Sequence, residues 1–161
     1  MGLYQRSLMR LSKTKPGRLL LSKFLTSLDL RLKNSRFAPT RFRLDLPLCY
    51  LTTTGRTSGE LRIVPLLFIG QPTSEGEPDA FAVAATNFGT EHHPGWSYNL
   101  EATPSGVLKI GDKSFSVTSR LLSEQESAAM WPRFEAIWPA YGTYRQIAPR
   151  DIKVYLLTRA G

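Results

Sequence analysis

The stretch that decides the fold is Leu51–Leu66, LTTTGRTSGELRIVPL. The β-branched run at its start is typical of a strand end, and the apolar run from Leu61 is typical of a second strand. Between them Gly55-Arg56-Thr57-Ser58-Gly59 predicts a tight turn, with positive φ at the glycines and amides that face outward. The stretch therefore predicts a β-hairpin.

This turn carries groups that bind anions. Arg56 and Arg62 flank it, and Thr54, Thr57 and Ser58 add hydroxyls. Guanidinium groups, hydroxyls and backbone amides around one corner recognise a phosphate or a carboxylate. An ordinary polar turn with a solvated arginine is the alternative, and the turn taken alone does not decide between the two.

Length and composition indicate one globular domain. A chain of 161 residues with 42% hydrophobic and 11% aromatic residues can form a hydrophobic core without stabilisation by a metal ion or a disulfide. The single cysteine, Cys49, excludes an intrachain disulfide and suggests a reducing, cytoplasmic compartment. His92 and His93 adjoin each other and have no cysteine at ligand spacing, so we expect no metal site.

The positive charge is concentrated at the N-terminus. Residues 1–43 hold 11 of the 21 Lys+Arg residues and one acid, Asp29, for a net charge of +10. The remainder carries a net charge of −2. We therefore divide the chain into a basic arm, residues 1–43, and a nearly neutral folded domain, residues 44–161.

The arm has two amphipathic patterns with helical spacing, separated by Pro16-Gly17. Their apolar stripes are Tyr4, Leu8 and Leu11, then Leu21, Leu25, Leu28 and Leu32. No segment approaches the ~20 apolar residues of a membrane span. Three interpretations stay open: a helix pair on an anionic membrane surface, helices packed on the domain or a second subunit, and a targeting or nucleic-acid-binding arm. We favour the first, on the inner face of the plasma membrane, and expect no nucleic acid.

The domain is predicted to be mainly β with flanking helices. Six short strands are expected, at Leu48–Thr54, Leu61–Ile69, Phe81–Ala85, Val107–Ile110, Ser114–Leu121 and Lys153–Leu157. The pair Gly111-Asp112 is a strong hairpin signal between two of them. Antiparallel-type strands with few helices between them favour a small β-barrel, and no GxGxxG supports a Rossmann unit.

Two helical regions interrupt the strands. Pro94–Ala102 predicts a short helix, and the capping box that begins at Ser123 opens a second one. Its apolar positions, which run to Tyr141, keep helical spacing. Pro132 falls inside this pattern, so we expect a kink or a restart there.

Two further groups of residues are candidates for a pocket. Small residues at Ala84 and Ala85 lead into Thr86 and Asn87, and they would let a flat ligand lie against the backbone. A plain strand exit is the alternative. Trp138, Tyr141 and Tyr144 form an aromatic stripe, which is either core or pocket; buried phenols would need hydrogen-bond partners.

Four segments together resemble one family. They are TTTGRTSGELRIVPL, AATNFG, HPGWSYNL and the region of Trp138, Tyr141 and Tyr144. In this order and spacing they resemble the deazaflavin-dependent nitroreductases of actinobacteria, over roughly residues 48–157. Thr57 stands where that family commonly has lysine, Asn87 where some relatives have lysine, and Trp138 where some have tyrosine.

The resemblance implies a split β-barrel, similar to FMN-binding split barrels, that binds coenzyme F420. The implied enzyme transfers a hydride from the reduced deazaflavin to an electron-poor small molecule such as a quinone, enone or nitro compound. A non-catalytic F420, flavin or haem binding or storage protein on the same barrel is the alternative, and a homodimer is compatible with either. The implied cofactor-binding residues are Thr54, Arg56, Thr57, Ser58, Gly59, Arg62, Pro65, Ala84, Ala85, Thr86, Asn87, Pro94 and Trp96. Trp138 would line the substrate pocket, and Tyr141 and Tyr144 would be catalytic.

Overall fold

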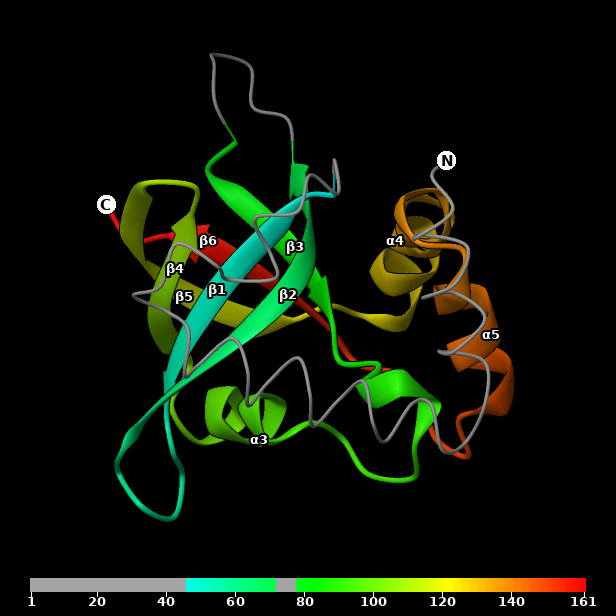
Figure 1. Ribbon diagram of the computed structural model, residues 1–161, viewed down its shortest axis with the longest axis horizontal. Coiled ribbons are helices and arrows are strands. Elements are labelled where there is room, and N and C mark those ends of the chain that lie inside the picture. Colours follow the sequence, from blue (N-terminus) through cyan, green and yellow to red (C-terminus); the bar gives the residue numbers. More distant parts are fainter. Residues whose placement is uncertain (1–45, 72–77) are drawn as a thin grey trace, which may run out of the picture. The chain divides into compact units, whose positions relative to one another are not determined.

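The computed structural model describes residues 46–71 and 78–161, so the basic arm and both of its apolar stripes lie outside the described residues. Six strands form a closed antiparallel barrel in the order β1-β2-β3-β6-β5-β4 (Figure 1). The strands are β1 (Leu48–Thr54), β2 (Leu61–Gln71), β3 (Ala80–Ala84), β4 (Ser105–Ile110), β5 (Lys113–Leu121) and β6 (Val154–Arg159). The predicted number of strands and their antiparallel pairing are confirmed.

Both predicted hairpins are present. In the first, β1 and β2 pair from Leu48 opposite Leu67 to Thr54 opposite Leu61. In the second, β4 and β5 are joined by a two-residue turn in which Gly111 has a φ of +56°. That φ lies in the left-handed region, which glycine adopts without steric cost.

Alternation along the strands separates two hydrophobic clusters. In β1 the inward side chains Cys49 and Leu51 are fully buried, and they belong to a cluster inside the barrel. In β3, Val83 joins this inner cluster, whereas Ala82 and Ala84 belong to a second, outer cluster. Successive strand residues point to opposite faces, so the outer cluster lies on the outside of the barrel wall.

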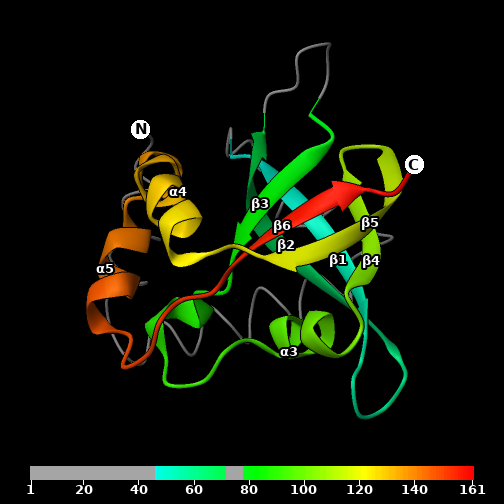
Figure 2. The same ribbon diagram turned by 180° about the vertical axis from the view of Figure 1, so that it is seen from behind.

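Helices cover one end and one side of the barrel. Helix α3 (Gly95–Ala102) runs across one end, where its Trp96 joins the inner cluster (Figure 1). Helices α4 (Glu124–Ile137) and α5 (Ala140–Ile147) lie beside one wall in both views (Figures 1 and 2). Their side chains fill the outer cluster.

The boundaries of α4 correct one expectation. The capping box is present: the Ser123 hydroxyl accepts a hydrogen bond from the Glu126 amide, and the Glu126 carboxylate accepts one from the Ser123 amide. The helix then runs unbroken through the exposed Pro132 to Ile137. The restart expected at Pro132 occurs instead at Pro139, the N-cap of α5, where the preceding Trp138 is extended, with φ −142° and ψ 97°.

Within the part of the chain that the structure describes, no helix is long and apolar enough to cross a membrane.

Candidate active site

The two glycines of the β1–β2 turn, Gly55 and Gly59, are required for different structural reasons. Gly59 has a φ of +70°, as expected for a left-handed turn position. Gly55 does not have a positive φ, contrary to prediction. A Cβ atom at Gly55 would lie 2.8 Å from the Ser58 hydroxyl and 3.1 Å from the Glu60 carbonyl oxygen. Gly55 is therefore required by the close approach of the returning chain.

The amides of this turn mostly face inward, which corrects the expected outward row of donors. Gly55 donates to the Glu60 carbonyl and Gly59 donates to the Gly55 carbonyl, both at 2.8 Å. The Glu60 amide donates to the Ser58 hydroxyl at 3.3 Å. The amide of Arg56 donates to the side chain of Asn99 at 3.0 Å. An anion at this turn would therefore be held chiefly by side chains.

Arg56 is oriented by helix α3. Its guanidinium carbon lies 4.6 Å from the centroid of the Tyr98 ring, a cation–π geometry. The carbonyl oxygen of the Asn99 side chain accepts the Arg56 amide, and the Asn99 side-chain amide donates to the Thr53 hydroxyl at 3.0 Å. Asn99 and Thr53 are both buried. Helix α3 therefore fixes the backbone at the start of the turn through Asn99, while the Arg56 side chain remains exposed.

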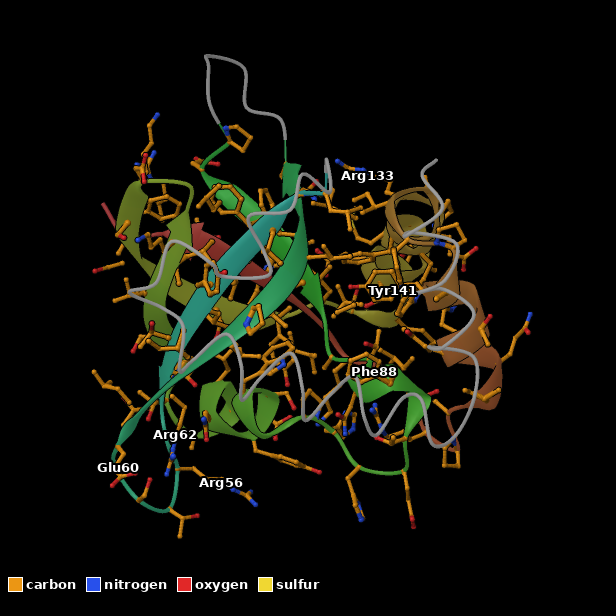
Figure 3. The ribbon with its side chains drawn as sticks, viewed as in Figure 1. Arg56, Glu60, Arg62, Phe88, Arg133 and Tyr141 are labelled. Atoms are coloured by element: carbon orange, nitrogen blue, oxygen red, sulfur yellow. The ribbon has the colours of Figure 1, made fainter. Side chains whose placement is uncertain are left out.

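Arg62 leaves the turn on its other side. Its guanidinium donates to the Glu60 carboxylate at 2.7 Å, and both side chains are more than half exposed. Thr57 and Ser58 are exposed at the tip, and Thr54 is half-buried at the end of β1. Figure 3 shows Arg56, Glu60 and Arg62 together on the hairpin. An exposed ion pair of this kind contributes little and can be exchanged for a ligand anion.

The segment after β3 has an unusual backbone. Ala84 and Ala85 are buried, and a short 3-10 helix follows at Asn87–Gly89. Asn87 and Phe88 have φ values of +43° and +57°, and Gly89 has a φ of +72°. Non-glycine residues in this region cost of order 1 kcal/mol or more each and gather at functional sites. The alternative of a plain strand exit therefore does not describe this segment, and the role of Thr86 and Asn87 toward a ligand stays a prediction.

Neighbouring groups hold this strained turn in place. The Asn87 side-chain amide donates to the His92 carbonyl at 2.9 Å. Gly89 packs so closely on α5 that a Cβ atom there would lie 2.7 Å from the side chain of Ile147 and 3.0 Å from the Tyr144 carbonyl oxygen. The turn and the aromatic helix α5 are consequently positioned by each other.

The aromatic stripe lies in the outer cluster. Tyr141 and Tyr144 are 6% and 3% exposed, and their ring centroids are 6.1 Å apart in an edge-to-face arrangement. Tyr144 also meets Phe88 edge-to-face at 5.8 Å. Trp138 and Ala84 belong to the same cluster. Burial raises the pKa of Tyr141 above its usual range, so this phenol stays protonated and can donate a hydrogen bond.

The predicted site residues fall into two groups. The hairpin arginines lie beside α3, whereas Tyr141 and Phe88 lie on the side of the barrel that α5 covers (Figure 3). Strand β2 connects the two places, since it begins next to Arg62 and reaches the outer cluster at Leu67. Pro65 lies between them, opposite Tyr50.

Two predicted cofactor contacts have other neighbours. Trp96 is 7% exposed and packs edge-to-face on Tyr155 at 5.6 Å inside the barrel. Pro94 is the N-cap of α3, and its carbonyl accepts hydrogen bonds from the amide and the hydroxyl of Ser97. The roles of Trp96 and Pro94 toward a cofactor stay predictions.

Comparison with known proteins identifies the family. The profile of the F420H(2)-dependent quinone reductases matches residues 32–159, most of the chain. The chain belongs to this family. Its predicted class, an F420H2-dependent oxidoreductase on a split barrel with coenzyme F420 as cofactor, is thereby confirmed, and the reading as a non-catalytic binding protein is not favoured.

Individual relatives agree with this membership. An F420H(2)-dependent quinone reductase of Mycobacterium tuberculosis is 28% identical over 121 residues, which cover 70% of this chain and 74% of that protein. The solved structure of an F420-H2 dependent reductase is 30% identical, covers 69% of this chain and 93% of its own, and has a TM-score of 0.60. A solved domain-swapped dimer is 27% identical, with coverage of 84% and 98% and a TM-score of 0.61.

In this F420H(2)-dependent quinone reductase family member, sequence reasoning missed two residues that contact the candidate site. Asn99 supports the Arg56 backbone, and Arg150 donates to carbonyl groups of the strained segment after β3. A buried asparagine next to Leu100 on an apolar helix face was a detectable signal for the first. Arg150 had none, because its partners lie 57 to 65 residues away, apart from its chain neighbour.

Proposed function

We propose that this F420H2-dependent reductase binds its coenzyme along strand β2. The acidic tail would lie at the β1–β2 turn, and the deazaflavin ring would lie beside the outer cluster. The observation that carries this proposal is that β2 joins a turn with two exposed arginines to a cluster with two buried tyrosines. From Arg62 to Leu67 the strand advances roughly 17 Å, at about 3.3 Å per residue. That span suits an elongated cofactor with one acidic and one flat apolar end.

At the tail end the donor set fits phosphate and carboxylate groups. Arg56 is exposed and already oriented over Tyr98. Arg62 would exchange its contact with Glu60 for the ligand anion. The hydroxyls of Thr54, Thr57 and Ser58 would complete the polar surroundings, with Gly59 allowing the chain to turn back close to the ligand. Charge-assisted contacts from guanidinium groups suit this task.

At the ring end small side chains and a rigid backbone favour a flat ligand. Ala84 and Ala85 present little bulk, and Thr86 and Asn87 follow directly in the strained turn. Pro65 would lie along the ring from β2. Pro94 and Trp96, the two predicted cofactor contacts of α3, would act from the end of the barrel, where Trp96 packs in the inner cluster.

The bound cofactor supplies the hydride, so the chain itself must orient the reactants and handle a proton. Trp138 would cover the substrate, and the phenols of Tyr141 and Tyr144 would donate a hydrogen bond to its carbonyl oxygen. Tyr141 is protonated throughout the neutral pH range, as any phenol is, so its hydroxyl carries the hydrogen that this contact requires. A quinone, which has two such oxygens, is the substrate that the family name indicates.

The assignment is tested by titrating the protein with F420 and with FMN, followed by tryptophan fluorescence. We expect F420 to bind and FMN to bind much more weakly. Reduced F420 is then mixed with a quinone, an enone and a nitroaromatic compound, and cofactor oxidation is recorded. Tighter FMN binding would contradict the proposal, and F420 binding without oxidation by any acceptor would favour the non-catalytic alternative.

Tyr141→Phe and Tyr144→Phe separate the chemical role of the hydroxyls from their packing role. We expect both variants to keep their F420 affinity while turnover slows, since a hydroxyl near the substrate acts on chemistry more than on docking. Turnover is measured under saturating F420H2, and thermal unfolding serves as the control. Unchanged rates with lowered thermal stability would assign both tyrosines to the core.

Two further features belong to this proposal. The basic arm, residues 1–43, would bring the enzyme to the inner face of the plasma membrane, where a membrane quinone is available. A homodimer is supported by the likeness to a solved domain-swapped dimer.

A further inference from the structure

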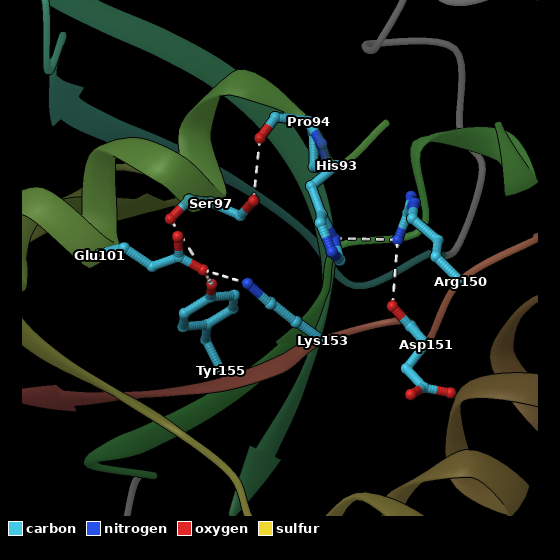
Figure 4. Close-up of polar contacts among 8 residues, drawn as sticks. All are labelled: His93, Pro94, Ser97, Glu101, Arg150, Asp151, Lys153 and Tyr155. Atoms are coloured by element: carbon cyan, nitrogen blue, oxygen red, sulfur yellow. Dashed lines mark hydrogen bonds and ion pairs between the residues drawn. The ribbon is translucent and has the colours of Figure 1, made fainter. Parts of the chain in front are cut away.

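Arg150 lies between α5 and β6 and faces the segment that follows β3 (Figure 4). Its Nη2 atom donates to the carbonyl oxygens of Ala85, Thr86 and His92, at 3.3, 3.0 and 3.1 Å. Its Nε atom donates to the carbonyl oxygen of Thr90 at 3.1 Å. One side chain therefore holds four backbone groups of a single loop.

These four carbonyls lie on both sides of the strained turn. Ala85 and Thr86 precede the left-handed residues, and Thr90 and His92 follow them. A backbone that favours another conformation persists only when its surroundings fix it from outside. Arg150 forms hydrogen bonds on both sides of the turn and thus stabilises this backbone conformation.

The third nitrogen of the guanidinium, Nη1, contacts the His93 Nδ1 atom at 2.9 Å and the Asp151 carbonyl at 3.3 Å. A guanidinium group has donors only, so Nδ1 must accept and the His93 ring must be neutral. A protonated ring would lose this hydrogen bond and would place a second cation beside Arg150.

Arg150 interacts with this loop through hydrogen bonds to neutral groups and not through an ion pair. Within residues 46–71 and 78–161, none of the ion pairs involves Arg150, and the Asp151 carboxylate points away from it (Figure 4). Partial burial lowers the pKa of Arg150, so the site withdraws a cation from water without a carboxylate partner. A planar fork with five N–H donors reaches several carbonyls at once, which a lysine ammonium cannot do.

We propose that Arg150 is a positioning residue that fixes Thr86 and Asn87 beside the deazaflavin ring, and that protonation of His93 weakens its hold. This inference rests on the proposed placement of the ring. It adds to that placement a residue outside every motif of the family resemblance, and a pH limit for cofactor binding.

The surroundings of His93 set the direction of the pH effect. Desolvation lowers its pKa first, and the charges of Arg150 and Lys153 lower it further, while Glu101 opposes them. The ring of Tyr98 meets it edge-to-face at 5.9 Å. His93 is therefore neutral at neutral pH. The Arg150 contact is present above the lowered pKa and is lost as pH falls through it.

Arg150→Lys is the decisive variant, with Arg120→Lys as its matched control. Arg120 contacts the exposed Glu126 through two nitrogens and lies outside the proposed site. Without cofactor, we expect faster hydrogen exchange in the peptide that covers residues 85–93 of Arg150→Lys. We also expect about a tenfold loss of F420 affinity, because a small misplacement of a binding segment is costly. Arg120→Lys should match the parent in both measurements.

His93→Asn tests the pH effect without the risk of unfolding that accompanies loss of Arg150. An asparagine side-chain oxygen can accept from Arg150 but does not titrate. F420 affinity of the parent should fall as pH drops through the lowered pKa of His93, which lies below the ordinary histidine value of 6.5, and this fall should be smaller in His93→Asn. An identical pH profile in both proteins would overturn the role of His93.

Two results distinguish failure of this inference from failure of the ring placement. If F420 does not slow exchange in residues 85–93 of the parent, the ring lies elsewhere and the inference falls with the placement. If F420 protects that segment in the parent, yet Arg150→Lys binds F420 as tightly, the placement stands and the role of Arg150 is overturned.

Discussion

At the scale of single residues, Asn99 connects the hairpin turn to helix α3 with one side chain. Its side-chain oxygen accepts a hydrogen bond from the Arg56 amide, and its side-chain nitrogen donates one to the Thr53 hydroxyl. Without Asn99, the Arg56 amide would lose its acceptor and the Thr53 hydroxyl would lose this donor. A buried donor or acceptor that loses its partner costs about 1–3 kcal/mol. The position of the exposed arginine is therefore determined by a residue that no ligand needs to touch.

Asn99→Ala should lower the free energy of unfolding by about 1–3 kcal/mol and also weaken F420 binding. Asn99→Asp keeps the acceptor for the Arg56 amide, but it buries a negative charge beneath the proposed anion site. We therefore expect Asn99→Asp to weaken F420 binding at least as much as Asn99→Ala does. Chemical denaturation and F420 titration measure the two effects. Equal affinity in the parent and Asn99→Ala would show that the Arg56 backbone needs no such support.

Arg56→Ala and Arg62→Ala should each weaken F420 binding by roughly fivefold, since contacts at an exposed turn are worth about 1 kcal/mol or less. The effect should shrink as salt rises, because exposed charges are screened. Glu60→Gln should strengthen binding slightly, since Arg62 then has no carboxylate to release. If both arginine variants bind F420 like the parent at low salt, the turn is a solvated hairpin.

The grouping of the candidate site residues was predictable where the signal was local. Gly59, Arg56 and Arg62 stand within one turn, so their proximity follows from the hairpin itself. Arg150 and Asn99 act across 64 and 43 residues, respectively, on groups that the fold brings to them. Backbone carbonyls as partners leave no mark in the sequence, so such contacts appear only in three dimensions.

At the scale of elements, the strands were predicted to within a few residues because apolar and β-branched runs between turn residues mark them. The pattern of β1 alternates at every residue, and the capping box fixes the start of α4. The break between α4 and α5 was misplaced, because Pro132 and Pro139 are equally visible in the sequence. Only the second proline ends a helix, since Pro132 lies on a solvent-exposed position where the loss of one hydrogen bond is tolerated.

Gly106 in β4 provides a test of how closely two strands approach. A Cβ atom there would lie 2.5 Å from the Thr52 carbonyl oxygen, which is a backbone atom that cannot move aside. Gly106→Ala should cost about 1–3 kcal/mol of stability through overpacking. Gly95→Ala is the control, because nothing lies within 4 Å of a Cβ atom at that helical position. Thermal denaturation should show a loss for Gly106→Ala and little change or a gain for Gly95→Ala.

At the scale of the whole molecule, the charge of the arm predicts binding to anionic lipid. Each basic residue near such a surface contributes about 1 kcal/mol, and the attraction decays within a Debye length. Burial of the stripe from Leu21 to Leu32 would add a part that salt does not remove. Binding to phosphatidylserine vesicles should therefore weaken, but persist, as salt rises.

A chain shortened to begin at Arg41 is the control for this prediction. All residues of the proposed site lie beyond that point, so the shortened protein should still bind F420 but should ignore vesicles. If instead the full chain ignores anionic vesicles at low salt and the shortened protein aggregates, the arm serves as a hydrophobic cover for the domain or a partner subunit.

The closed barrel also limits how copies of this chain can associate. Among the strands of residues 46–71 and 78–161, each has a neighbour on both sides, so this part of the chain presents no edge strand for the addition of a strand from another molecule. The shortest seam joins β1 to β4 over three residue pairs, Tyr50 to Lys109, Leu51 to Leu108 and Thr52 to Val107. If the barrel opens, it should open there first, and the two released edges would make the molecule competent for domain exchange or for fibril growth.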